Sequence, residues 1–247
     1  MPAELACYYD AACDGPSNMA RDECLLYDEG VAPAALRLYA WEPATLSLGY
    51  FQRIGDLSAQ PAEIRALPVV RRTTGGGAIL HDREITYALI VDQSLPIGRV
   101  GPTGLYELAH QCWAQTLRAH GVDSDTAPDD APLPSPRGGP FFCFEKPGRT
   151  DLSLAGRKLL GSSQRRIPGR VLQHGSLMLG QRFSAHPGAQ LSDVADVDVD
   201  AWRRDFAARI ADALQLALTP RVWTSRQLAD VDVRRARYAS PEWTAKR

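Results

Sequence analysis

The sequence has no surplus of positive charge, and it lacks long apolar runs and closely spaced cysteine pairs. Its 28 Lys and Arg residues are balanced by 29 Asp and Glu residues, which gives a formal net charge of −1 at pH 7. Nucleic acids and anionic membranes are bound through basic patches, so neither is an expected partner. Nowhere do about eighteen apolar residues run together, and residues 1–15 have neither the basic nor the apolar region of a signal peptide. No membrane span and no secretion signal are therefore expected.

The cysteines are few and scattered. None of the five forms a C-x-x-C pair, so neither a disulfide framework nor a metal site such as a zinc site is expected. A reducing cytoplasm is the compartment that fits such a set best. The five are Cys7, Cys13, Cys24, Cys112 and Cys143.

The length and composition are those of an ordinary globular protein. A chain of 247 residues with 45% hydrophobic residues can form one α/β or α+β domain with a sizeable core, or two small domains. We find no internal repeat and no change of composition sharp enough to mark a linker. One domain over residues 1–247 is therefore predicted.

Local patterns predict the elements in outline. Ser17 and Asp200 are candidate helix N-caps, and Thr224 with Gln227 forms a capping box. Strands are expected at 5–9, 37–39, 46–50, 69–70 and 85–91, helices at 17–29, 61–66, 105–119 and after 200 and 224, and a loop over 124–140.

The most informative stretch runs from Cys143 to Leu179. Two turn signals, Ala155-Gly156 and Pro168-Gly169, separate segments in which apolar residues alternate, as in an antiparallel meander. Strict alternation places Lys158 on one face of the middle strand with Leu160, Ser162 and Gln164, and places Leu159, Gly161 and Ser163 on the other.

Small and polar residues interrupt this meander. The segment His174-Gly175-Ser176 is a polar kink in an otherwise apolar strand, and glycine inside a strand marks a bulge or a close approach of the backbone to a ligand. A thiol at the head of the meander (Cys143), an amine on it (Lys158) and small residues beside both suggest an acyl-transfer site.

A second informative stretch, RRTTGGGAILHD, occupies residues 71–82. Three consecutive glycines are poor strand formers, but they suit a loop whose bare N–H groups face a carbonyl or a phosphate. The spacing matches neither a Walker loop nor G-x-G-x-x-G, so no nucleotide-binding motif is claimed. The flanking Arg72 and His81 favour a functional loop over a merely flexible one.

The two stretches together resemble the lipoate and octanoate branch of the biotin–lipoate protein ligase superfamily. RRTTGGGAILHD is similar to its glycine-rich ligand loop, and AGRKLLGSSQRR with LQHGSLML is similar to its lysine-bearing strand and return strand. NMARDECLLY, YAWEPATLSLGYFQ and YASPEW also match. The resemblance implies an α+β fold in which helices pack on a mixed or antiparallel sheet. It also implies a ligand tunnel between them and a ligand-binding core at about residues 31–218.

Within that branch the sequence is most similar to the cysteine-dependent octanoyltransferases, in which a Cys-Phe-acidic element lies ahead of the lysine as Cys143-Phe144-Glu145 does here. The resemblance implies an enzyme that moves an octanoyl group from octanoyl-acyl carrier protein to a lysine of a lipoyl domain. That domain would belong to a 2-oxoacid dehydrogenase or to the glycine cleavage H protein, and no cofactor is needed. Gly77 in the loop departs from this pattern, because the transferases often carry a bulkier residue there. The alternative is an ATP-dependent lipoate–protein ligase, which would use ATP and Mg and in which Cys143 would be incidental.

Each site residue has an implied role and a structural alternative. Cys143 is the expected nucleophile, and Lys158 is the cation that favours its thiolate and then takes a proton from the attacking amine. Alternatively, Cys143 is a buried hydrophobe, Lys158 is a surface lysine, and the histidines only hold turns. The expected substrate-binding residues are Arg72, Gly75, Gly76, Gly77, Ala78, Ile79, Leu80, His81, Asp151, Gly161, Ser163, His174, Gly175 and Ser176. A monomer is expected, while the sequence leaves open the acyl group, the acceptor and the need for ATP.

Overall fold

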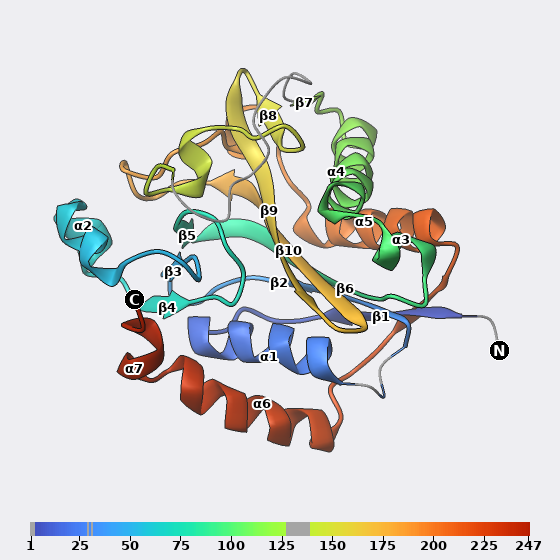
Figure 1. Ribbon diagram of the computed structural model, residues 1–247. Helices are drawn as coiled ribbons and strands as arrows, with labels where there is room; N and C mark the ends of the chain where they lie inside the picture. Colours follow the sequence, from blue (N-terminus) through green and yellow to red (C-terminus); the bar gives the residue numbers. More distant parts are fainter. Residues whose placement is uncertain (1–2, 29, 31, 127–138) are drawn as a thin grey trace.

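The computed structural model describes residues 3–28, 30, 32–126 and 139–247. Its main element is a mixed eight-stranded sheet, and a second, three-stranded sheet lies beside it (Figure 1). The large sheet runs in the order β11 (Ala217–Pro220), β1 (Glu4–Tyr9), β2 (Ala34–Tyr39), β6 (Arg83–Asp92), β10 (Arg170–Gly180), β9 (Arg157–Ile167), β8 (Leu152–Leu154) and β7 (Asp125–Thr126). The small sheet runs in the order β4 (Val69–Arg71), β3 (Thr45–Leu48) and β5 (Ile79–His81). This architecture confirms the predicted α+β fold class.

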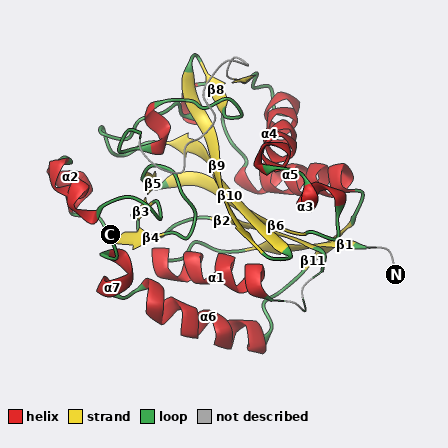
Figure 2. Cartoon of the chain, viewed as in Figure 1, coloured by secondary structure: helices red, strands yellow, loops and turns green. Residues whose placement is uncertain are grey.

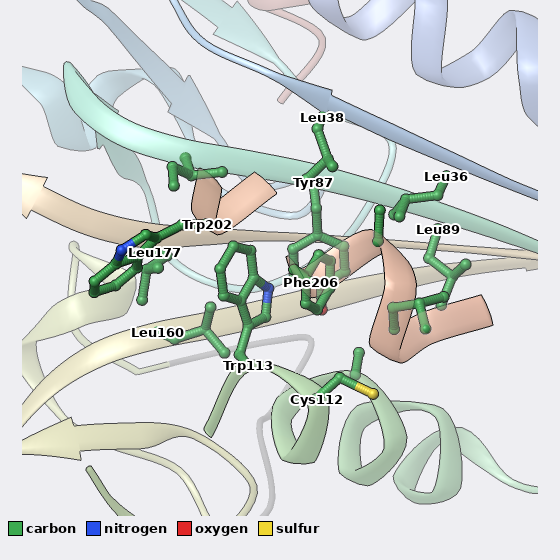
Figure 3. Packing of buried hydrophobic residues seen from close by; sticks show 14 of the residues in the cluster. Leu36, Leu38, Tyr87, Leu89, Cys112, Trp113, Leu160, Leu177, Trp202 and Phe206 are labelled. Atoms are coloured by element: carbon green, nitrogen blue, oxygen red, sulfur yellow. The ribbon is translucent and has the colours of Figure 1, made fainter. Parts of the chain in front are cut away.

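Helices cover both faces of the large sheet, as the alternation along β6 requires (Figure 2). Residues 85, 87, 89 and 91 of β6 belong to one apolar cluster, under α4 (Pro102–Ala119) and α5 (Val199–Leu214). There the rings of Trp113 and Phe206 stack with centroids 3.9 Å apart (Figure 3). Ala88 and Ile90 face the opposite cluster, to which α1 (Gly15–Tyr27) and α6 (Ser225–Tyr238) contribute.

Short helical segments complete the chain. Three are α-helical, namely α2 (Ala62–Arg65), α3 (Pro96–Arg99) and α7 (Pro241–Thr244), and three are 3₁₀ turns, namely η1 (Ile54–Ala59), η2 (Cys143–Glu145) and η3 (Leu191–Asp193). None of the helices in the described part of the chain is long and apolar enough to cross a membrane. Within the same residues, no three His, Cys, Asp or Glu side chains gather in a way that could hold a metal ion.

The predicted meander is confirmed, but its first strand begins later than expected. Strands β8, β9 and β10 pair antiparallel, and the turn at Ala155-Gly156 places both residues at positive φ. Cys143, however, lies in η2 rather than on a strand, so the thiol precedes the meander by a loop. Of the predicted loop 124–140, residues 125–126 form β7, and residues 127–138 lie outside the described part of the chain.

Two of the predicted helix starts were wrong by two or three residues. The first helix is capped by Asp14, whose carboxylate accepts a hydrogen bond from the N–H of Ser17, because Pro16 already has the φ of a first turn. The helix α5 is likewise capped by Asp198 and not by Asp200. In contrast, the capping box formed by Thr224 and Gln227 is confirmed at the start of α6.

A buried charge network joins β2 to α1. The guanidinium of Arg37, which is fully buried, lies 2.6 Å from Asp10 and 2.8 Å from Asp22, and it also donates to the side chain of Asn18. Burial alone would raise the pKa of Asp10, but Arg37 outweighs it and holds that pKa below its ordinary value. Asp10 therefore adds stability above the pKa that it has in the unfolded chain, and this contribution is lost as the pH falls through its lower folded pKa.

Replacing Arg37 with leucine is expected to lower the free energy of unfolding by about 3–5 kcal/mol, because two buried carboxylates lose their shared cation. Urea unfolding followed by far-UV circular dichroism measures this. The matched control is Arg209→Leu, which breaks the half-buried Arg209–Asp205 pair on α5 and is expected to cost less than about 1 kcal/mol. Equal losses in the two variants would contradict the structural importance of the Arg37 network.

Arg71, at the end of β4, ties the C-terminal turn to the centre of the fold. Its buried guanidinium donates to the carbonyl oxygens of Gly49 (2.9 Å), Gln52 (2.7 Å) and Thr244 (2.8 Å). In return, the indole N–H of Trp243 donates to the carbonyl oxygen of Arg71 at 2.8 Å. The loop after β3 and the helix α7 are therefore held by one side chain.

Candidate functional site

The loop that carries Cys143 is attached directly to the glycine-rich loop. The N–H of Ala78 donates to the carbonyl oxygen of Phe141 at 2.7 Å, and the N–H of Cys143 donates to the carbonyl oxygen of Ala78 at 2.9 Å. A Cβ on Gly77 would lie 2.8 Å from the backbone nitrogen of Cys143. Only a glycine therefore allows the two segments to approach this closely.

The half-buried thiol of Cys143 faces an amine that is held by a carboxylate. Lys158 Nζ lies 3.5 Å from Cys143 Sγ and 2.6 Å from Asp151 Oδ2, and both Lys158 and Asp151 are almost fully buried. Burial alone would lower the pKa of Lys158, but the negative charges of Cys143 and Asp151 raise it to about 12. The amine is therefore an ammonium at neutral pH, placed where it stabilises a thiolate.

Strict alternation along β9 gave the wrong face for Lys158. A Cβ on Gly161 would lie 2.2 Å from Lys158 Cε, so the two residues share a face instead of lying on opposite faces. The pairing of β8 with β9 shifts register between Leu152 and Ser153, and such an irregularity adds one residue to the alternation. Gly161 leaves the space that the lysine side chain occupies.

Replacing Gly161 with alanine is expected to displace the Lys158 side chain and to lower the turnover of the site by about 100-fold, because the new methyl group would lie only 2.2 Å from the lysine Cε. The contact is with a flexible side chain that can shift while keeping its ion pair with Asp151, so the fold should persist with little change in melting temperature. Gly55→Ala is the matched control, because a Cβ there meets nothing within 4 Å. Turnover and melting temperature measured on both variants check this, and an unchanged turnover for Gly161→Ala would contradict it.

Arg72 organises the glycine-rich loop from behind. Its buried guanidinium donates to the carbonyl oxygens of Gly75 (2.7 Å) and Gly77 (2.6 Å), and no carboxylate partner lies among the described residues. Burial lowers the pKa of Arg72 to about 10, and the charge of Cys143 acts in the opposite direction. A negative charge at Cys143 therefore stabilises this buried cation.

Gly76 lies between the guanidinium and the thiol. It has a φ of +89°, and a Cβ on it would lie 3.2 Å from Arg72 Nη2 and 4.0 Å from Cys143 Sγ. Among the described residues, the N–H groups of Gly76 and Gly77 have no hydrogen-bond acceptor. Unpaired backbone donors next to a nucleophile can bind an oxygen on which negative charge develops.

The two predicted histidines support Arg72 through hydroxyl groups. His81 Nε2 lies 2.7 Å from the Ser47 hydroxyl, and His174 Nε2 lies 2.7 Å from the Thr74 hydroxyl; Arg72 donates to both hydroxyls. On their other sides, Glu84 holds His81 Nδ1 at 2.7 Å and Asp22 holds His174 Nδ1 at 3.1 Å. Burial lowers the pKa of His81 despite Glu84.

The remaining predicted residues are divided between the site and its surroundings. Ser163 donates to the carbonyl oxygen of Gly75 at 3.0 Å, whereas Ser176 donates to Glu84 and not to the loop. Leu80 and Ala78 pack in the apolar cluster of the small sheet. Gly175 is paired regularly within β10, without the predicted kink, and a Cβ on it would lie 2.2 Å from the hydroxyl oxygen of Ser162.

A narrow hollow with about 10 Å³ of free space, roughly the room that one water molecule needs, lies behind Arg72. Aromatic and apolar side chains form most of its wall, and the two histidines complete it. Its lining consists of Met19, Tyr39, Trp41, Arg72, Ile79, His81, Thr86, His174, Gly175 and Ser176. An aliphatic chain therefore fits there only after these side chains have moved apart.

Sequence reasoning missed the roles of several residues. Asp151 was expected to bind substrate, but its carboxylate pairs with Lys158 and accepts from the N–H of Gly148. Ser47, Asp22 and Glu84 come from three different elements, so no spacing joined them to Arg72. Of the contacts that these three residues make with Arg72 and the two histidines, only that between His81 and Glu84 joins residues that are close in the sequence, three positions apart, so only this contact could have been expected from a local pattern.

Comparisons with known families, sequences and solved structures all find similarity to lipoate ligases or octanoyltransferases. The family described as lipoyl protein ligase A/B catalytic domain matches residues 14–215. Octanoyltransferase LipM of Geobacillus kaustophilus is 33% identical over 95% of both chains, and that of Bacillus subtilis is 32% identical over the whole of both. Among solved structures, a lipoate-protein ligase A bound with ATP superposes with a TM-score of 0.79 at 19% identity, over 99% of each chain. A bi-partite lipoate protein ligase from Thermoplasma acidophilum gives 0.73 at 17% identity, over 98% of this chain and 96% of that one.

Proposed function

This chain belongs to the lipoyl protein ligase A/B catalytic domain family, and from that premise we propose that it transfers an octanoyl group through a thioester on Cys143. The donor is octanoyl-acyl carrier protein, and the acceptor is a specific lysine of a lipoyl domain. The relatives confirm the octanoyltransferase function expected from the sequence. The residue roles below are our proposal, and the observation that carries them is the 3.5 Å distance between Lys158 Nζ and Cys143 Sγ.

In the first step the thiolate of Cys143 attacks the thioester carbonyl of the donor. A tetrahedral oxyanion forms, which the free N–H groups of Gly76 and Gly77 stabilise. The bond to the carrier sulfur then breaks, and the carrier leaves as a thiolate that takes up a proton from water. One thioester replaces another, so the step needs no ATP.

In the second step the neutral amine of the acceptor lysine attacks the acyl-enzyme. Acylation removes the charge of Cys143, which is one of the two contributions that raise the pKa of Lys158. Lys158 can then exchange its proton more readily: it gives up one proton to solvent and accepts one from the attacking amine. The C–S bond breaks, the amide forms, and the thiolate of Cys143 is restored beside the ammonium.

In this scheme the hollow behind Arg72 widens and takes the aliphatic chain. Its wall contains the rings of Tyr39 and Trp41 and the side chain of Arg72, which also binds the carbonyl oxygens of Gly75 and Gly77. Burying the methylene groups there contributes about 0.8 kcal/mol for each. The acyl head is then held beside the sulfur by the part of the substrate that does not react.

We extend the proposal to the whole chain and its setting. Residues 1–247 act as one catalytic domain, since α6 packs on α1 and β11 pairs with β1. The enzyme acts as a monomer in the cytoplasm, where the five free thiols stay reduced. Lipoyl domains of 2-oxoacid dehydrogenases or the glycine cleavage H protein are the acceptors.

The experiment that tests this function is an intact-mass measurement. The protein is incubated with octanoyl-acyl carrier protein without ATP and quenched in acid, and a gain of about 126 Da is expected for one octanoyl group. Hydroxylamine should remove the adduct, and peptide mapping should place it at Cys143. No adduct, together with product formation only from free acid and ATP, would establish the lipoate–protein ligase instead.

A further inference from the structure

A network of hydrogen bonds between buried polar groups crosses the sheet and ends at the residue before Asp151. His110, on α4, is 2% exposed, and its Nδ1 contacts the carbonyl oxygen of Thr150. Its Nε2 lies 2.6 Å from the Ser162 hydroxyl, which in turn lies 2.7 Å from the Tyr87 hydroxyl. Gln173 donates to Tyr87 at 2.7 Å. None of these groups belongs to the chemistry described above.

The chemistry of each group determines which partner donates in every hydrogen bond of this network. A carbonyl oxygen only accepts, so His110 Nδ1 carries a proton and donates to Thr150. Burial lowers the pKa of His110, so the ring is neutral and its Nε2 accepts from Ser162. The Ser162 oxygen then accepts from Tyr87, and Tyr87 accepts from Gln173. One tautomer of His110 satisfies all partners.

This network fixes the position of Thr150, the residue that precedes Asp151 in the site. Thr150 is followed by Asp151, whose carboxylate lies 2.6 Å from Lys158 Nζ and also accepts from the N–H of Gly148 at 2.6 Å. Residues 148–151 thus form a tight turn with two anchors, its own Asp151–Gly148 bond and the His110–Thr150 bond. The second anchor comes from a different layer of the fold.

We propose that His110 is a positioning residue for the Asp151–Lys158 pair, acting through the Thr150 carbonyl, and that Ser162 and Tyr87 hold His110 in the required tautomer. The inference rests on the proposed role of Lys158 beside Cys143. Without the His110 donor, a buried carbonyl is left unpaired, the turn shifts, and the ammonium no longer faces the sulfur. The rate of the chemical step falls, while donor binding is unchanged because His110 does not line the hollow behind Arg72.

Variants of His110 test this in the full-length protein. His110→Leu is expected to lower kcat for octanoyl transfer by about 100-fold, with KM unchanged within about twofold. His110→Asn should recover most of the loss, because its amide N–H stands where Nδ1–H stands. His110→Gln should recover less, because its amide group extends toward Ser162. Ser162→Ala removes the tautomer support, and with it the acceptor of the Tyr87 hydroxyl, but it keeps the His110–Thr150 bond and should give an intermediate kcat.

A second readout separates this inference from the proposed function. The rate at which iodoacetamide alkylates Cys143, located by peptide mass, reports the thiolate and requires no octanoyl donor. His110→Leu should slow it and His110→Asn should restore it, even if the physiological reaction were a different one. Leu117→Ala, also buried on α4, controls for lost stability and should leave the alkylation rate unchanged. If His110→Asn is no better than His110→Leu in both readouts, or if Leu117→Ala slows alkylation as much, the positioning role is wrong.

Discussion

Replacing Cys143 with alanine is expected to abolish octanoyl transfer, with a fall of more than about 10⁴-fold in kcat. The thiol is the nucleophile of the proposed first step, so its removal leaves no group beside Lys158 on which the acyl thioester can form. The mass adduct of about 126 Da should disappear with the activity, because no other thiol meets the acyl head. Transfer to a purified lipoyl domain, followed by mass spectrometry, measures the first effect.

The control for this experiment is a second half-buried thiol. Cys13 resembles Cys143 in exposure, but it lies at the start of the chain, where it pairs with Trp41 in an isolated bridge. Cys13→Ala should retain both the adduct and the turnover. Undiminished transfer by Cys143→Ala, with a requirement for ATP, would exclude the acyl-enzyme and favour the adenylate route of the ligases.

Replacing Lys158 with methionine is expected to have two effects. Asp151 remains buried without its cation, so the free energy of unfolding should fall by about 3–5 kcal/mol. The thiolate of Cys143 also loses the nearest positive charge, so the rate of alkylation at neutral pH should fall by about ten- to a hundredfold. Chemical unfolding and iodoacetamide labelling measure the two effects separately.

The double variant Asp151→Asn with Lys158→Met separates stability from chemistry. Since it removes both charges, most of the lost stability should return, whereas the slow alkylation should remain. A double variant that stays as unstable as Lys158→Met would show that the pair is not the source of the stability. A double variant with normal alkylation would show that Lys158 does not act on the sulfur.

The sequence predicted those parts of the fold that depend on short-range patterns. The meander follows from two turns and period-two alternation, and the capping box at Thr224 follows from its own four residues. The starts of the first helix and of α5 were misjudged because two polar residues near each start could serve as cap. Proline in the first turn settled the choice at Asp14.

The site was harder to predict because its supports come from distant elements. Cys143 and Lys158 could be proposed as a pair from a family resemblance, and Arg72 from its position before the glycines. No local pattern linked Arg72 to Ser47, Asp151 to Lys158, or His110 to Thr150, since each contact depends on how the sheets and helices pack. The face of Lys158 was wrong because a register shift in pairing leaves no mark in the sequence of the strand itself.

The clamp formed by Arg71 has a practical consequence for how the enzyme is handled. Its guanidinium holds the segment after Gly49 and the turn of α7 together, and a Cβ on Gly49 would overlap the carbonyl oxygen of Gly76. Contacts through Arg71 and Gly49 therefore connect the helix α7 to the glycine-rich loop that faces the thiol. Truncation or proteolytic trimming within residues 241–247 is therefore expected to change the rate of the reaction.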